Sequence, residues 1–197
     1  MDEVSRFGGR VTSRDGTPVA YERYGGGDGP PLVLVGGAPG TAAGERALAG
    51  LLARSLPVVA YARRGHGGTV EREIEDLAAV LAAAGPGAAV HGAGTGGALA
   101  LAAAAAGLPV GPVSVYEPAP TGASLGRVSA RVLVVDGGAS PAEARRAARA
   151  LAAALPRARH RTLTGQTHEV APHVLAPVLT EFLAKSLAEE RDFPDTP

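Results

Sequence analysis

Four glycines within six residues are the first feature of the sequence that is suited to chemistry. They lie in the run 90–97, which reads as the end of a strand, a sharp turn and the start of a helix. Amides at the start of a helix bind anionic oxygens. Gly92, Gly94 and Gly97 also match the G-x-G-x-x-G spacing of dinucleotide sites, and Glu117 follows twenty residues after Gly97. That alternative stays open, although the strand is the fifth apolar element and not the first.

The counts of cysteine and histidine limit the nucleophilic and metal-binding chemistry open to the chain. The chain has no cysteine, which excludes disulfides, thiolate metal sites and a cysteine nucleophile. It has five histidines, the side chains suited to proton transfer near neutral pH. No set of His, Asp and Glu has metal-ligand spacing, so we expect neither a metal nor another cofactor.

The elements around the glycine-rich run alternate between strands and helices. Two short strands, 10–12 and 19–22, flank Asp15-Gly16 and predict a hairpin. Further strands are predicted at 32–35, 58–61, 88–91, 113–116, 132–135 and 159–163, and helices at 44–54, 71–84, 95–106, 141–155 and 172–189. This order predicts an α/β fold with a mostly parallel sheet between two helical layers. Ligands of such sheets bind beyond the carboxyl ends of the strands, where the glycine-rich turn is expected.

Length and composition favour one globular domain. The 197 residues suit one domain better than two, and 28 glycines with 16 prolines stay just below the range of disordered chains. We expect a single domain over 1–197, with its core at about 10–190 and a frayed tail at 191–197.

The net charge and the hydropathy of the chain limit the kinds of partner that it can bind. The 19 basic and 19 acidic residues cancel and the arginines are scattered, which argues against nucleic acid and anionic membranes as partners. Residues 1–9 are polar, and no run of about 18 apolar residues occurs. We expect a cytoplasmic protein whose partner is a small organic molecule.

Four segments in this order resemble the α/β-hydrolase family. The run 90–97 has the strand, turn and helix context of a G-x-S-x-G nucleophile elbow. Segments 34–40 and 61–67 each follow a predicted strand, and 165–168 lies late in the chain. The resemblance covers about 11–187. It implies a three-layer, doubly wound α/β-hydrolase sheet without a cap domain.

The resemblance implies that Gly94 occupies the position of the serine nucleophile. Glycine has no side chain, so no acyl-enzyme can form there. Thr95 is an alternative nucleophile, but its hydroxyl belongs to the first helical turn and not to the apex of the elbow.

His168 matches the position of the family's general base. The loop 137–140 has no acid to orient it, and Asp136 lies inside a strand end and is expected to point elsewhere. Glu117 ends the strand 113–116, after which haloalkane dehalogenases carry their acid, so Glu117 is expected to partner His168 and orient it. Alternatively, His168 is an ordinary loop residue and Glu117 caps a turn.

The same resemblance implies that the amides of Ala38 and Thr95 bind an oxyanion, although they could equally serve ordinary turn hydrogen bonds. His91 could face the flank of the sheet or the pocket. An unpaired Arg63 could bind a substrate carboxylate or, preferably, reach solvent. The possible pocket residues are Gly37, His66, His91 and Arg63.

Many family members carry a helical lid after the strand that here ends near Glu117. The segment 118–129 is too short for one, so water is expected to reach the site. An exposed apolar rim at Pro118, Pro120 and Leu125 would favour a homodimer.

Three alternative functions are consistent with these residues. The first is cofactor-independent acid–base chemistry (elimination, isomerisation or cyclisation) on a small and possibly polyketide-like metabolite, with His168 as the acid or base. The second is an inactive homologue that binds a ligand or a protein. The third is hydrolysis by water that His168 activates in the space above Gly94.

Overall fold

One eight-stranded sheet organises the chain in the computed structural model, which describes residues 6–26, 29–37, 42–64 and 68–192. The spatial order is β1-β2-β4-β3-β5-β6-β7-β8. Strand β2 is antiparallel to both of its neighbours, and the other pairs are parallel. The strands are β1 (Arg6–Thr12), β2 (Pro18–Tyr24), β3 (Leu32–Val35), β4 (Val58–Tyr61), β5 (Ala89–Ala93), β6 (Val113–Tyr116), β7 (Val132–Gly137) and β8 (Ala158–Leu163).

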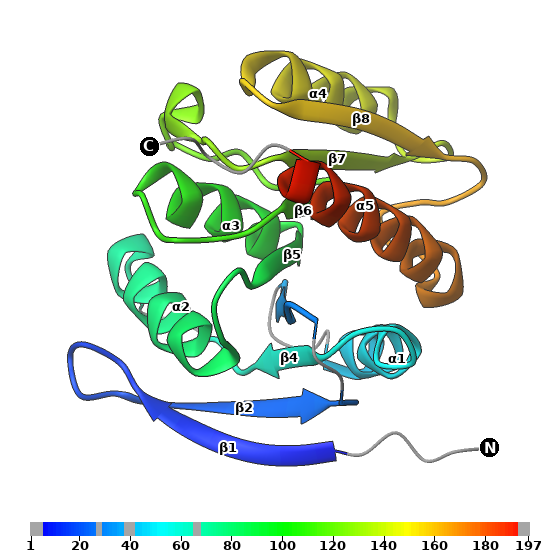
Figure 1. The fold of residues 1–197 in the computed structure, drawn as a ribbon. Helices are drawn as coiled ribbons and strands as arrows, with labels where there is room; N and C mark the ends of the chain where they lie inside the picture. Colours follow the sequence, from blue (N-terminus) through cyan, green and yellow to red (C-terminus); the bar gives the residue numbers. More distant parts are fainter. Residues whose placement is uncertain (1–5, 27–28, 38–41, 65–67, 193–197) are drawn as a thin grey trace.

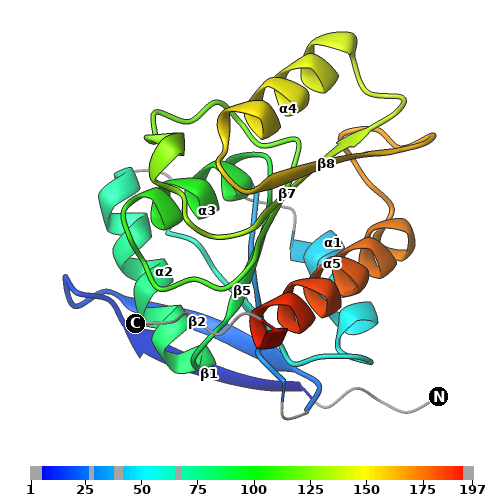
Figure 2. The ribbon, with the colours of Figure 1, turned by 45° about the horizontal axis from the view of Figure 1, so that its top comes forward.

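Helices cover both faces of this sheet. Figures 1 and 2 show α2, α3 and α4 on one side, and α1 and α5 side by side on the other. The described helices are α1 (Ala42–Leu52), α2 (Val70–Ala84), α3 (Thr95–Ala105), α4 (Ala142–Ala154) and α5 (Pro172–Asp192). The predicted three-layer α/β fold is confirmed, and the described residues include no cap domain.

Alternation along the buried strands divides the core in two. In β3, Leu32 and Leu34 face α1 and α5, whereas Val33 and Val35 face α2 and α3. All four side chains are buried, as expected for a parallel strand that is covered on both faces.

The central helix α3 lies very close to the sheet because its contact residues are glycine and alanine. A Cβ placed on Gly96 would lie 2.2 Å from the carbonyl oxygen of Val35, so only glycine fits there. This approach lets small side chains such as Ala100 and Ala103 bury almost all of their surface. The helix thereby holds its first turn against the ends of β3 and β5.

The first strand is longer than predicted. It starts at Arg6 and not at Arg10, because pairing with β2 outweighs the low strand propensity of Gly8 and Gly9. The ring of Tyr21 lies where a Cβ on Gly9 would be, so this glycine makes room for a cross-strand aromatic.

The connection from β6 to β7 contains a single 3-10 turn, η1 (Leu125–Arg127). Leu125 is partly buried and packs against the core beside α3, and Val128 is fully buried. The predicted exposed apolar rim is therefore wrong at Leu125, because this segment closes the core instead of leaving its apolar groups in water. Pro118 is also partly buried, and Pro120 alone of the three is exposed.

Candidate active site

A sharp turn joins β5 to α3 at Gly94. Its φ of 52° and ψ of −121° form a backbone conformation that side chains with a Cβ rarely adopt. The Gly94 amide donates to the carbonyl of Tyr116 at 3.0 Å, and the Gly94 carbonyl accepts from the amide of Ala119 at 2.9 Å. The turn is thus tied to the end of β6 and to the residues after it.

The glycines of this turn differ in the space around them. A Cβ on Gly92 would lie 2.4 Å from the backbone of Gly96, so a side chain is excluded there. A Cβ on Gly94 would meet only Nε2 and Cε1 of His168, each at 3.8 Å, which is ordinary van der Waals contact. Sterically, position 94 has room for a side chain directed at His168.

The imidazole of His168 is anchored on one side by Glu117. Its Nδ1 lies 3.0 Å from Oε2 of Glu117, whose Oε1 accepts the amide of Gly137 at 2.9 Å. When Nδ1 donates to this carboxylate, the lone pair of Nε2 is left on the side of the ring that faces Gly94. This arrangement is suited to a general base.

Burial and backbone strain accompany this pair. The Glu117 side chain is 4% exposed, whereas that of His168 is 65% exposed. Glu117 is also the one residue other than glycine, among those described, with a positive φ, at 39°. Residues with strained backbone conformations cluster at active sites, which favours a functional role for Glu117.

Tyr116 supports the loop that carries His168. Its hydroxyl donates to the carbonyl of Thr167 at 2.5 Å, and burial raises the pKa of that hydroxyl so that it stays protonated. Gln166 accepts the amide of Ala171 at 3.0 Å and links the loop to the start of α5. The end of β6 therefore positions the carboxylate, the glycine turn and the histidine loop.

Arg63 is neither unpaired nor directed to solvent, so that expectation is wrong. Its Nε and Nη2 bind the carboxylate of Glu73 at 3.0 and 2.7 Å. Its Nη1 donates to the carbonyls of Gly36 and Gly37 and to Oγ1 of Thr95, at 2.9, 3.2 and 3.0 Å. The folded chain brings in Glu73 from α2, a partner that the sequence pattern around Arg63 did not indicate.

The Arg63 network holds the end of β3 against the start of α3. Thr95 uses its hydroxyl as an acceptor within it, and its amide is in the first helical turn, where amides have no acceptor within the helix. The neighbouring Arg64 pairs with Asp76 and Asp15. Ala38 and His66, two further expected site residues, lie outside the described residues.

His91 lies in the core of the sheet and not at its open end. It is 4% exposed, and its Nδ1 lies 2.8 Å from the Ser114 hydroxyl on the adjacent strand β6. Burial lowers its pKa to about 4, so the imidazole is neutral at physiological pH. This placement agrees with the alternative in which His91 faces the flank of the sheet and not the pocket.

Asp136 and His160 form a second carboxylate–imidazole pair that the sequence did not reveal. Oδ2 of Asp136 lies 3.0 Å from Nε2 of His160, and Asp136 is fully buried. The two residues are diagonal neighbours in the β7–β8 register, where Asp136 pairs with Thr162. The alternation of side chains along β7 and β8 could have placed Asp136 and His160 on the same face of the sheet. The sequence does not give the register between these two strands, so the contact was not predicted. Asp136 does not contact His168.

The described residues contain neither a metal-binding cluster nor a membrane-spanning helix. Within them, no group of three or more His, Asp or Glu side chains could hold a metal ion. No helix in the same part of the chain has both the length and the apolar character needed to span a membrane.

Comparison with known proteins supplies the family. A model described as "Alpha/beta hydrolase family" matches residues 32–196. An α/β hydrolase from Sphaerobacter thermophilus is 36% identical; the alignment covers 89% of this chain and 100% of that one, with a TM-score of 0.80. No curated protein matches the chain.

More distant structures share the fold. A dienelactone hydrolase from Anabaena variabilis is 16% identical, with 93% of this chain and 99% of that one covered and a TM-score of 0.81. Est1E from Butyrivibrio proteoclasticus is 14% identical, with 92% and 99% covered and a TM-score of 0.75. With the model match and the 36% identical relative, this chain belongs to the α/β-hydrolase family.

Proposed function

We propose that this chain hydrolyses a small ester or lactone with a water molecule activated by His168, and that no covalent intermediate forms. The observation that carries the proposal is the orientation of His168. Glu117 holds Nδ1 at 3.0 Å, while Nε2 faces Gly94, which has no side chain. A general base without a nucleophile beside it is suited to deprotonating water directly.

In this proposal Gly94 replaces the serine nucleophile of the family. The sharp turn with its positive φ and the 3.8 Å between Nε2 and the Cβ position of Gly94 support this assignment. An acyl-enzyme through residue 94 is then impossible. The Thr95 hydroxyl is a poor substitute because it accepts a hydrogen bond from Arg63.

The reaction needs one proton transfer in each direction. Nε2 of His168 takes a proton from water, and the resulting hydroxide attacks the substrate carbonyl carbon. The Thr95 amide, and by the family resemblance the Ala38 amide, bind the oxyanion of the tetrahedral intermediate. Glu117 stabilises the imidazolium, which then returns its proton to the leaving alkoxide.

Arg63 is a positioning residue in this scheme. Its bonds to the Gly36 and Gly37 carbonyls and to Thr95 hold the two oxyanion-binding segments at a constant separation. Its charge is already paired with Glu73, so it is not proposed to bind a substrate carboxylate.

Two observations favour water over non-hydrolytic chemistry. The His168 side chain is 65% exposed, so water has access to the ring. The 36% identical relative is described as a hydrolase, and a dienelactone hydrolase shares the fold.

Proton transfer within the substrate, giving elimination, isomerisation or cyclisation, is the second candidate. It is supported by the room beside Gly94, which would let a substrate carbon approach Nε2.

The test compares His168→Gln with the unmodified protein on p-nitrophenyl acetate and on small lactones. We expect turnover to fall by about 10²- to 10⁴-fold, the usual contribution of a general base. His173→Gln is the matched control, because His173 is exposed in the first turn of α5 and His168 is the histidine that pairs with Glu117. Intact-mass spectra during turnover should contain no acyl adduct.

The remaining outcomes separate the alternatives. Incorporation of deuterium from D2O into a ketone or lactone, without hydrolysis and only when His168 is present, would favour the second candidate, proton transfer within the substrate. Turnover that is the same in the unmodified protein and in His168→Gln in every assay would overturn both candidates, and turnover at the buffer background in both would indicate an inactive homologue.

A further inference from the structure

Strand β1 lies at one edge of the sheet, and the side of it that faces away from β2 is open. Figures 1 and 2 show it along the border of the molecule, and β2 is its one neighbour in the described sheet. All seven residues of β1 pair with β2 in one continuous antiparallel register, without a bulge or a proline. Exposed edge strands of natural proteins are usually short, bulged or covered, because an open edge can pair with another chain. No described strand pairs with the outer side of β1, so this edge is available for pairing.

The hydrogen bonds of the hairpin show which backbone groups of β1 point outward. The Ser13 amide donates to the Thr17 carbonyl at 2.8 Å, next to the turn. In an antiparallel pair, hydrogen-bonded and non-hydrogen-bonded positions alternate along the strand. Val11, Gly9 and Phe7 therefore bond to β2, and the amides and carbonyls of the residues between them point away from the sheet. These outward residues are Arg6, Gly8, Arg10 and Thr12.

One face of β1 carries an apolar row that ends in an uncovered side chain. Phe7, Gly9 and Val11 share the face that points toward α2, where Val11 packs against the core. The ring of Tyr21 lies over Gly9, with its hydroxyl 2.6 Å from the Cβ position of that glycine. Phe7 is 68% exposed, the highest value among the exposed large apolar residues described. A partner that covers Phe7 would remove this apolar surface from water, which favours association.

We propose that two copies of this chain form a dimer by pairing their β1 strands antiparallel, about a two-fold axis at Gly9. The two sheets become one continuous sheet, and the outward amides and carbonyls of both strands are satisfied. The homodimer expected from the sequence thus uses β1 and not the segment 118–129. The interface is separate from the candidate active site beyond β5 and β6, and it does not depend on the proposed hydrolysis.

The positions of the arginines select this axis. With the axis at Gly9, Arg10 lies opposite Gly8 of the second copy. Arg6 then lies opposite Thr12, and all seven residues of the strand pair. An axis at Gly8 would place Arg6 opposite Arg10 of the second copy, and an axis at Arg10 would oppose the two Arg10 side chains. Like charges in directly opposed positions destabilise strand pairs, so the Gly9 axis is favoured.

On the face toward α2, the same axis brings apolar groups together. Phe7 lies opposite Val11 of the second copy in a non-hydrogen-bonded pair, the type in which the side chains are closer. The two Gly9 Cα atoms approach to about 4.5 Å, so the Tyr21 hydroxyls of both copies meet near the axis. Each Phe7 ring is thereby covered, and this burial of apolar surface stabilises the dimer.

The other face contributes an ion pair. Glu22 is the β2 partner of Gly8, and Arg10 of the second copy lies on the other side of the same glycine. Because Gly8 has no side chain, this arginine extends across it toward the Glu22 carboxylate. That carboxylate is 38% exposed and lies 3.8 Å from Arg6, so a second guanidinium has access to it. An exposed pair of this kind adds little affinity but favours one register.

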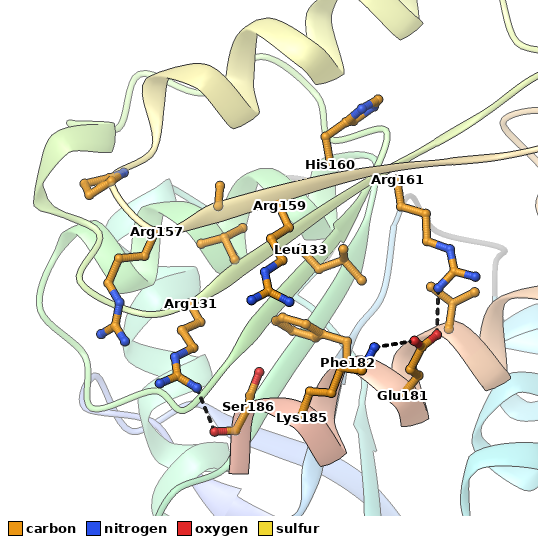
Figure 3. A pocket seen from close by; sticks show the side chains of 14 residues that line it. Arg131, Leu133, Arg157, Arg159, His160, Arg161, Glu181, Phe182, Lys185 and Ser186 are labelled. Atoms are coloured by element: carbon orange, nitrogen blue, oxygen red, sulfur yellow. Dashed lines mark hydrogen bonds and ion pairs between the residues drawn. The ribbon is translucent and has the colours of Figure 1, made fainter. Parts of the chain in front are cut away.

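The other edge of the sheet, β8, is less suited to pairing with itself. Figure 3 shows Arg159 and Arg161 on the side of β8 that faces α5, and His160 on the other side. Glu181 on α5 binds Arg161 at 2.8 Å, so this side chain is held within its own chain. An axis at His160, near the middle of β8, would place Arg159 opposite Arg161 of the second copy. The dimer therefore forms through β1.

Sedimentation velocity over a range of protein concentrations tests for association. A contact of one strand pair is small, so we expect a dimer with a dissociation constant on the order of 10 µM. Gly8→Lys and Gly8→Glu are the matched variants, because a Cβ on Gly8 would lie 4.0 Å from the carbonyl oxygen of Tyr21, which is ordinary contact. Position 8 faces Arg10 of the second copy. Gly8→Lys should therefore weaken dimerisation about fivefold, and Gly8→Glu should strengthen it about fivefold.

Single cysteine variants test the register. The chain has no cysteine, so an introduced thiol has no competitor. Mixed under mild oxidation, Phe7→Cys and Val11→Cys should form a disulfide-linked heterodimer, because directly opposed Cβ atoms are within disulfide range. Each variant alone should stay largely unlinked, since its two thiols lie about 13 Å apart along the paired strands. Phe7→Cys mixed with Ala147→Cys, which is exposed on α4, is the control.

Each of three results would overturn the proposal. The first is a monomer at concentrations about tenfold above the expected dissociation constant. Hydrogen exchange at the Gly8 and Arg10 amides would then be slow if another segment of the chain covers β1, and fast if the edge stays in water. The second is a dimer that responds alike to Gly8→Lys and Gly8→Glu. The third is a mixture of Phe7→Cys and Val11→Cys that links no better than the control, because the contact would then lie elsewhere.

Discussion

Gly94→Ser tests whether the catalytic geometry of an acyl-transfer enzyme persists without its nucleophile. The Cβ position lies 3.8 Å from both Nε2 and Cε1 of His168, and beyond residues 93–95 no other described residue has an atom within 4 Å of it. A hydroxyl oxygen one bond further would lie about 3 Å from Nε2, within hydrogen-bond reach of a general base. We therefore expect the variant to acquire covalent chemistry.

The expected magnitudes follow from the same geometry. A positive φ of 52° at a residue with a Cβ costs about 2 kcal/mol of stability, which a folded domain can usually tolerate. Activation by a positioned base should raise ester cleavage by about 10²- to 10⁴-fold over the same variant with His168→Ala. Gly94→Ala is the matched control, since it carries the same backbone strain without the hydroxyl.

The assay is a p-nitrophenyl acetate burst together with labelling by a fluorophosphonate. Gly94→Ser should give a burst stoichiometric with protein, and peptide mapping should locate the label at position 94. The reasoning is refuted if Gly94→Ser is as stable as Gly94→Ala and yet gives neither burst nor label. The turn and His168 would then not form a catalytic arrangement.

Three other perturbations probe the supports of the site. Gly96→Ala should cost about 3 kcal/mol in urea unfolding, because its Cβ would lie 2.2 Å from the carbonyl oxygen of Val35. The pKa of His91 is about 4 in the folded protein, against 6.5 for an exposed histidine, so the unfolded chain binds more protons between these two values. The free energy of unfolding should therefore fall by about 3 kcal/mol as the pH drops from 6.5 to 4. His91→Asn should have a shallower pH dependence of stability over the same range. Arg63→Gln should cost about 3 kcal/mol, because it leaves the carboxylate of Glu73 poorly paired at 12% exposure, and should lower kcat more than it raises KM. Arg63→Lys should restore the charge and only part of kcat.

Local patterns were sufficient to predict most of the fold. The four residues of β6 were predicted with the bounds that the structure has, because a short run with β-branched and aromatic residues between two prolines favours a strand over a helix. Strand β1 was predicted four residues too short, since its glycines form a strand only through pairing with β2. Its start therefore depended on a contact between segments and not on local propensity.

For the candidate site, the sequence and the family resemblance together put Glu117 and His168 in loops at the same edge of the sheet. The contact between them, at 3.0 Å, is a property of the folded chain. Arg63 was misjudged because Glu73 lies on a helix whose orientation toward β4 cannot be read from the spacing. The roles assigned to Glu117 and His168 remain proposals.

What the sequence by itself determined was the order of strands and helices, the glycine positions that permit the sharp turn, and the missing side chain at Gly94. These depend on residue type and local periodicity, which act over a few neighbouring residues. Only the tertiary structure decided which charges meet: Arg63 with Glu73, Asp136 with His160, and Arg161 with Glu181. Pairing between residues far apart in the chain depends on register and packing across the sheet, which local sequence does not encode.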